Sequence, residues 1–195
     1  MAPADLAERQ LHRAAEPVEI GEVRPFVRDW KFDELAAKVA DGLKGRSFAK
    51  GKQLFTALAC FSCHQMKGVG GLVGPDLAKM ESKKDHAHIL RSILEPSKEI
   101  DKKFEAWIIV TEKGKQFTGL LVEENDQSVT LMPNPLGQEK CEPIKIAKAD
   151  IDIKAKSPIS LMPEKLANTM TLEEILDLMA YLEARGNPDH AAFKK

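Results

Sequence analysis

The sequence predicts a mainly α-helical fold that carries a small antiparallel β insertion, of about the size of an SH3 or Sm fold. Segments 32–43 and 48–60 show apolar residues at the i, i+3, i+4, i+7 spacing of amphipathic helices. A third amphipathic segment, 172–182, begins at a capping box that starts with Thr171. Between 104 and 157 the pattern changes to short β-branched or alternating segments, which indicates strands.

These patterns divide the chain into a leader, a helical core and an insertion. Residues 1–30 form the leader or linker, whose last part is expected to pack through Phe26, Val27 and Trp30. The helical core comprises 31–103 and 158–195, and 104–157 is the β-rich insertion. Within the core, Ser47 can cap one helix, Gly51 suggests a close helix crossing, and a further short helix is expected over 85–94. The insertion has four or five short strands, expected at 107–111, 116–122, 128–132, 144–146 and 151–153.

Composition excludes several classes of function. The 29 basic and 30 acidic side chains leave a formal charge of −1, so the chain lacks the basic footprint of a nucleic-acid-binding protein. No apolar run reaches the roughly 20 residues that a transmembrane helix needs. The sequence also shows no secretory signal pattern at its start.

The most informative motif is Cys60-Phe61-Ser62-Cys63-His64, which has the C-x-x-C-H pattern of covalent haem attachment. Each thiol can add to one vinyl group of a porphyrin, and the adjacent imidazole of His64 can bind the iron. A thioredoxin-like redox pair, half of a zinc site and a chance match are the alternatives. A redox pair is expected near a βαβ pattern, whereas this motif is expected to end a helix. Zinc needs about two more ligands, and the third cysteine, Cys141, has no histidine near it in sequence.

A glycine-dense stretch, 68–77, follows the motif. It lacks both the strand that precedes a dinucleotide fingerprint and the Gly-Lys-Ser/Thr ending of a phosphate loop. Backbone without Cβ atoms can lie against a flat macrocycle. A metal-bound histidine almost always donates its other ring N–H, so a carbonyl of this loop is the expected acceptor for His64.

Several motifs together resemble the class I cytochrome c core, and more narrowly a haem-binding domain widespread in planctomycetes and verrucomicrobia. They run in order from about Pro25 to Leu182 and are Pro25-Phe26-Val27, Gly51 to Phe55, Cys60 to His64, Gly70 to Leu77, Ile93 to Lys98, Ser160-Leu161-Met162-Pro163 and the helix from Leu176 to Leu182. The resemblance implies one covalent haem c, a Pro75 carbonyl that accepts the His64 N–H, and Met162 as the second axial ligand. Lys165 departs from the pattern, because glycine is expected there.

The choice of sixth ligand can also be argued from the residues. Met170 and Met179 belong to the last helix and its approach, where methionine is most often core filling. Met66 is too close to the attachment site, Met80 lies just past the proximal loop, and Met132 belongs to a strand. Met162 lies in an irregular loop that prolines can stiffen. His86 and His88 are the main alternatives, although two histidines that close are expected to be surface residues on different helix faces.

These observations predict a single-haem domain that carries electrons and is not itself an enzyme. Its expected partner is a redox protein or a fused dehydrogenase domain, and neither nucleic acid nor membrane is expected. The alternatives are a haem enzyme or gas sensor with a labile sixth position, and a docking module in which the haem is secondary. Since haem is attached outside the cytoplasmic membrane, the chain is expected to be periplasmic or otherwise exported. Cys141 is expected to be a free thiol near a strand end, although an odd cysteine in an exported protein can also pair between two chains.

Overall fold

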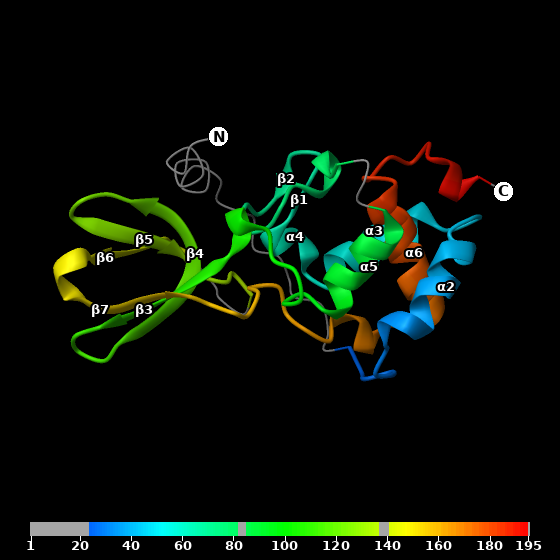
Figure 1. Cartoon of the computed structure of the whole chain (residues 1–195). Coiled ribbons are helices and arrows are strands. Elements are labelled where there is room, and N and C mark those ends of the chain that lie inside the picture. The colour runs from blue at the N-terminus through cyan, green and yellow to red at the C-terminus, as the bar shows by residue number, and fades with distance from the viewer. Residues whose placement is uncertain (1–23, 82–84, 137–140, 195) are drawn as a thin grey trace.

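The structure is a computed structural model that describes residues 24–81, 85–136 and 141–194. Residues 1–23 of the expected leader, with His12, lie outside this part. A helical region and a five-stranded sheet lie side by side, and loops and a short hairpin lie between them (Figure 1). The α-helices are α2 (Phe32–Gly42), α3 (Phe48–Ala57), α4 (Cys60–Cys63), α5 (His86–Leu94) and α6 (Leu172–Glu183). The strands are β1 (Gln65–Met66), β2 (Val69–Gly70), β3 (Ala106–Thr111), β4 (Gln116–Glu124), β5 (Ser128–Met132), β6 (Ile144–Ala147) and β7 (Ile151–Lys156).

The helical region is organised around the crossing of α3 and α6. The crossing is close because Gly51 of α3 has no side chain: a Cβ there would lie 2.3 Å from the Asp177 carbonyl oxygen and 2.6 Å from Tyr181 Cβ. The Tyr181 ring then packs between Phe48 and Phe55, at centroid distances of 5.4 and 5.6 Å. The close crossing expected from Gly51 is therefore confirmed.

The expected helix ends are also present. Ser47 Oγ accepts a hydrogen bond from the Lys50 amide at the start of α3, and Asp85 caps α5 in the same way through the His88 amide. Thr171 and Glu174 form the capping box of α6. Each cap satisfies an amide that has no partner inside its helix, so these residues fix where the helices begin.

The segment before α2 packs differently from expectation. Trp30 is buried and its Nε1 donates to the Met170 carbonyl oxygen at 3.0 Å. Phe26 and Val27 instead remain 69% and 43% exposed, so the prediction that they anchor the leader is wrong. A backbone hydrogen bond from Val27 and an ion pair of Arg24 hold this segment against the approach to α6. Of the three expected apolar anchors only Trp30 is buried, and the rest of the segment is attached through polar contacts.

The insertion folds into one antiparallel sheet with the strand order β6-β5-β4-β3-β7. Four strands form a meander, and β7 returns after a 3-10 turn, Lys148–Asp150, to pair with β3. Register shifts at Val110/Thr111 and Leu121/Glu123 bend the sheet. Its inner face encloses a separate core of Ile109, Val129, Leu131 and Ile146. All five expected strands are present.

The sheet is too large for the predicted mainly α class. Only 38% of the described residues are helical, so this part of the molecule is a helical region plus a sheet. The two parts meet in a third cluster, which we call the joint cluster: Val73, Leu120, Val122 and Met132, with Cys63, Cys141 and Leu161 packed against them. In this cluster the sheet contacts Cys63 of the motif and two loop residues, Val73 and Leu161.

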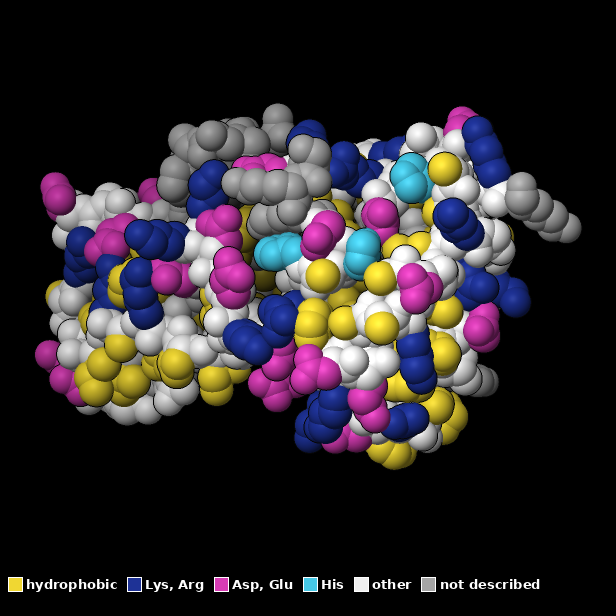
Figure 2. All heavy atoms as spheres, turned by 45° about the vertical axis from the view of Figure 1, so that its right-hand side comes forward, with side chains coloured by type: hydrophobic (Ala, Val, Ile, Leu, Met, Phe, Trp, Pro, Cys, Tyr) yellow, Lys and Arg dark blue, Asp and Glu magenta, His cyan; other side chains and the backbone are white. Residues whose placement is uncertain are grey.

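The surface is mixed in charge. On the face drawn in Figure 2, Lys and Arg side chains are interspersed with Asp and Glu over both the sheet and the helical region. Among the helices of the described residues, none is both long and apolar enough to cross a bilayer.

Candidate functional site

The Cys60–Cys63 turn is set off from the helix before it. α3 ends at Ala57, and Ala59 takes the left-handed conformation with φ 53°. The chain therefore turns sharply before α4, which contains both cysteines and ends with the His64 amide bonded to the Cys60 carbonyl oxygen. The motif was expected to end the preceding helix, and this is wrong: it forms a short helix of its own.

The glycine-dense stretch lies directly against the backbone of this turn. The Gly71 amide donates to the Phe61 carbonyl oxygen at 2.7 Å, and the Gly74 amide donates to that of Cys63 at 2.8 Å. A Cβ at Gly71 would lie 2.0 Å from the Ser62 carbonyl oxygen, and one at Gly74 would lie 2.6 Å from His64 Cε1. Glycine is required at both positions because no side chain fits between the loop and the turn.

This loop also fixes the imidazole of His64. Nδ1 lies 3.0 Å from the Pro75 carbonyl oxygen, and because a carbonyl only accepts, Nδ1 is the protonated nitrogen and Nε2 is free. Burial lowers the pKa of His64, and the bond to Pro75 opposes this in part. The histidine is thus a neutral, oriented ring, which is the form that binds a metal. The expected contact with Pro75 is present.

The pKa values of the two thiols are raised, whereas those of a redox dithiol are lowered. Burial raises the pKa of Cys60 to about 12, and burial together with nearby Cys141 raises that of Cys63 to about 11. Catalytic dithiols need a lowered thiol pKa, so this environment argues against the thioredoxin-like alternative. Within the described residues, no group of three or more His, Cys, Asp or Glu side chains could hold a metal ion, so the zinc alternative lacks its ligands.

A cavity of about 690 Å³ opens beside this turn. Cys60, Cys63, His64 and Pro75 lie on its wall, and Met162 reaches the same cavity from the far end of the chain. Much of the remaining wall is apolar, from Phe55, Leu58, Ile89, Ile93, Phe104, Leu136, Leu166, Leu178 and Leu182. Its volume falls in the range of about 300–1,000 Å³ that is usual for ligand and cofactor sites. The sequence separates His64 and Met162 by 98 positions, but the fold brings them to one space.

The loop that bears Met162 is irregular and held by hydrogen bonds. The Met162 amide donates to Ser160 Oγ at 3.1 Å, and the Leu161 carbonyl oxygen accepts from Asn134 Nδ2 at 2.9 Å. The Ser160 amide donates to Ser97 Oγ at 3.2 Å. The sequence gives no role to Asn134 and includes Ser97 only in the motif Ile93 to Lys98, because only the tertiary fold brings both residues to this loop. Lys165 adopts φ 64°, the left-handed conformation that explains why glycine was expected there.

Some of the other candidate ligands line the cavity and others lie outside it. Met80, Met170 and His88 also line the cavity, so Met170 is both core filling and part of the cavity wall. His88 is half-buried, which differs from the expected surface position. His86 lies elsewhere, with Nδ1 3.9 Å from Glu183 Oε2. The remaining methionines, Met66, Met132 and Met179, are buried outside the cavity wall.

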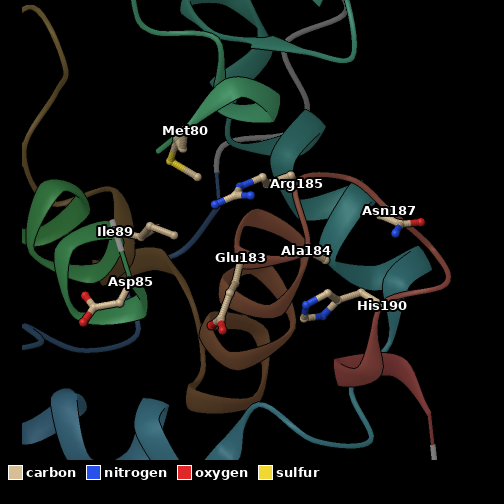
Figure 3. A pocket seen from close by; sticks show the side chains of 8 residues that line it. All are labelled: Met80, Asp85, Ile89, Glu183, Ala184, Arg185, Asn187 and His190. Carbon is tan, nitrogen blue, oxygen red and sulfur yellow. The ribbon is translucent and has the colours of Figure 1, made fainter. Parts of the chain in front are cut away.

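A second cavity, of about 480 Å³, lies between the start of α5 and the end of α6 (Figure 3). Met80 and Ile89 line both cavities, whereas Glu183, Arg185 and His190 line the second alone. Glu183 Oε2 and Arg185 Nε are buried without a hydrogen-bond partner. No thiol lines this cavity, so it is not the attachment site.

Comparison with known families agrees with this geometry. Residues 48–118 match the family model described as cytochrome c. The chain carries a cytochrome c domain. The match begins at the first residue of α3 and ends inside β4, so it does not include the Met162 loop or α6. No curated protein matches the chain.

The cytochrome c family binds covalently attached haem c, and the cavity fits that group. Two thiols and a neutral imidazole share one wall, the wall is largely apolar, and the glycine contacts leave the imidazole in place. In this cytochrome c domain Cys60 and Cys63 would form the thioethers and His64 would bind the iron through Nε2.

The third thiol is also near this site. Cys141 Sγ lies 3.4 Å from the Pro133 carbonyl oxygen and 3.9 Å from Met132 Sδ, in the joint cluster with Cys63. It is half-buried, and burial raises its pKa. Pairing of Cys141 between two chains stays a prediction.

Proposed function

We propose that this protein is a monohaem electron carrier in which His64 and Met162 bind the iron from opposite faces. A haem-based electron-transfer role follows from the cytochrome c domain. The bound haem supplies an iron that gains and loses one electron. The observation that supports Met162 is its place on the wall that His64 shares, in a loop that three hydrogen bonds hold.

The other sulfurs of the cavity fit a ligand role less well. Met170 is 1% exposed and packs in the helical core, and its carbonyl oxygen accepts the Trp30 indole. Met80 lines both cavities and lies only five positions after Pro75, which binds His64. Of the three, only Met162 lies in the loop that the class I resemblance assigns to the ligand.

The residues around the haem would set its electron affinity. A thioether ligand favours ferrous iron and raises the potential relative to two nitrogen ligands. A high potential suits a protein that accepts electrons, so we propose a dehydrogenase module or partner as the donor. Cytochrome c domains are typically exported, and we place this one in the periplasm or an equivalent compartment. The narrower resemblance to the planctomycete-type domain is part of the same proposal.

Replacement of Met162 tests the ligand assignment. Met162→Ala should leave haem attached through the two cysteines, lower the potential, remove the far-red sulfur-to-iron band and open the sixth position to added imidazole. Absorption spectra of the oxidised protein and a redox titration measure all of these effects.

Met132→Ala is the matched control, because Met132 is a buried methionine outside the cavity. We expect it to cost about 2–5 kcal/mol of stability and to leave the band in place. If Met162→Ala keeps the band and potential, the ligand is another residue. If the wild-type spectrum already shows an open sixth position, the gas sensor or haem enzyme is the better description.

A further inference from the structure

The peptide unit before Met162 is held at both of its polar atoms. Its oxygen, from Leu161, accepts from Asn134 Nδ2 at 2.9 Å, and its N–H, from Met162, donates to Ser160 Oγ at 3.1 Å. The Ser160 bond is local to the loop. The Asn134 bond comes from the sheet side of the molecule, two residues after the end of β5.

Asn134 is itself held in place. Its Oδ1 accepts from the Leu136 amide at 3.0 Å, which orients the amide so that Nδ2 faces Leu161. The strand that leads to it is buried throughout, and Met132 lies in the joint cluster with Leu161 and Val73. Val73 adjoins Gly74, which contacts the His64 ring. One rigid strand end therefore contacts the loops on both sides of the cavity.

We propose that Asn134 is a positioning residue for Met162, and that through it the β-sheet holds the thioether on the iron. This inference rests on the ligand role proposed for Met162. A thioether is a weak ligand, so its occupancy of the sixth position depends on how firmly the surrounding loop is held. Groups that orient metal ligands typically change metal affinity or activity by about 10–100-fold when they are removed.

Three variants separate positioning from general stability. Asn134→Ala removes the hydrogen bond to the Leu161 carbonyl oxygen and the one from the Leu136 amide. Asn134→Asp has nearly the same size and keeps the acceptor for Leu136, but replaces the donor to Leu161 with an oxygen that repels the carbonyl. Asn125→Ala is the control: Asn125 Oδ1 accepts from the Gln127 and Ser128 amides in the β4–β5 turn, so it has a similar turn-holding role in the same sheet.

The readouts are the imidazole affinity of the oxidised protein, the temperature at which the far-red band is lost, and the potential. We expect both Asn134 variants to bind imidazole roughly tenfold more tightly or more. They should also lose the band at lower temperature and show a lower potential. Asn125→Ala should leave the imidazole affinity and potential unchanged, whatever it does to the unfolding temperature.

Equal imidazole affinity and potential in wild type and Asn134→Asp would overturn the inference. An equal effect of Asn125→Ala would also overturn it, because sheet stability alone would then explain the change. Met162→Ala keeps the two proposals apart. If Met162→Ala loses the band while the Asn134 variants behave as wild type, only the positioning role fails. If Met162→Ala keeps the band, the ligand assignment fails first.

Discussion

At the scale of single residues, Gly74 and His64 show how a missing side chain organises the site. The loop passes so close to the imidazole that a Cβ at Gly74 would lie 2.7 Å from Nδ1, the atom that donates to Pro75. Only glycine at position 74 lets the loop approach the imidazole this closely, and this approach orients the ring.

Gly74→Ala should disturb proximal ligation. The added methyl group must displace either the loop or the imidazole, so we expect a larger high-spin fraction in the oxidised spectrum. Gly68→Ala is the control, since no atom lies within 4 Å of a Cβ there and only its φ of +80° is unfavourable. That control should cost about 1 kcal/mol or more of stability with an unchanged spectrum. A normal low-spin spectrum for Gly74→Ala would contradict this account.

The sequence was informative about this site where the signal is local. Cys60, Cys63 and His64 are adjacent in the chain, and the glycines that follow them indicate a close backbone contact. Phe26 and Val27 gave a wrong prediction because apolar character alone does not say whether a partner surface exists. Ser97 was noted only as part of the motif Ile93 to Lys98, and Asn134 gave no functional signal, because their contacts with the Met162 loop span 63 and 27 positions.

At the scale of elements, a helix was predicted best when the sequence marked its start, its apolar face and its end independently. The last helix has a capping box, an apolar face and a terminal glycine, and the structure places it at Leu172–Glu183 as expected. The helix from Phe48 was predicted too long. Nothing in its propensities marks Ala59 as left-handed, because the tertiary position of the cysteine turn imposes that conformation.

Gly51→Ala tests the helix crossing. Alanine favours a helix over glycine by about 1 kcal/mol, so propensity alone predicts stabilisation. The Asp177 carbonyl and Tyr181 leave no room for the methyl group, and we expect a net loss of about 1–3 kcal/mol in the free energy of unfolding by guanidinium. Lys52→Ala, at an exposed position of the same helix, should change stability by less than about 0.5 kcal/mol. A stabilised Gly51→Ala protein would show that the crossing can relax.

At the scale of the whole molecule, three apolar clusters share the burial. The helical region and the interior of the sheet each have their own core, and the joint cluster connects them at the wall of the cavity. Because Cys63, Val73 and Leu161 belong to that cluster, the sheet contacts the attachment turn, the glycine-dense loop that orients His64, and the loop that bears Met162. The size of the insertion could be predicted from its strand patterns. Where it docks could not, because the alternation of each strand marks two faces without naming their partners.

Leu120→Ala tests the joint cluster. Leu120 is buried at 5% exposure, and its truncation should lower the free energy of unfolding by about 2–5 kcal/mol. Ile153→Ala, on the same sheet at 50% exposure, should cost much less. Guanidinium unfolding followed by both haem absorbance and far-ultraviolet circular dichroism measures the change. If Leu120→Ala costs no more than Ile153→Ala, the sheet is not stabilised through this cluster.

The first and last strands of the insertion are neighbours, and the Ser157 amide donates to the Ala106 carbonyl oxygen at 2.8 Å. The chain therefore leaves and re-enters the haem-binding part at nearly one point, so about fifty residues are added without separating the two flanks in space. Because the two ends of the insertion lie close together, a module of different length or sequence can be inserted between residues 104 and 157 without changing the fold of the flanking chain. A substitute module would need only two features of the present sheet. These are an apolar surface against Val73 and Leu161 and one amide donor for the loop that bears Met162.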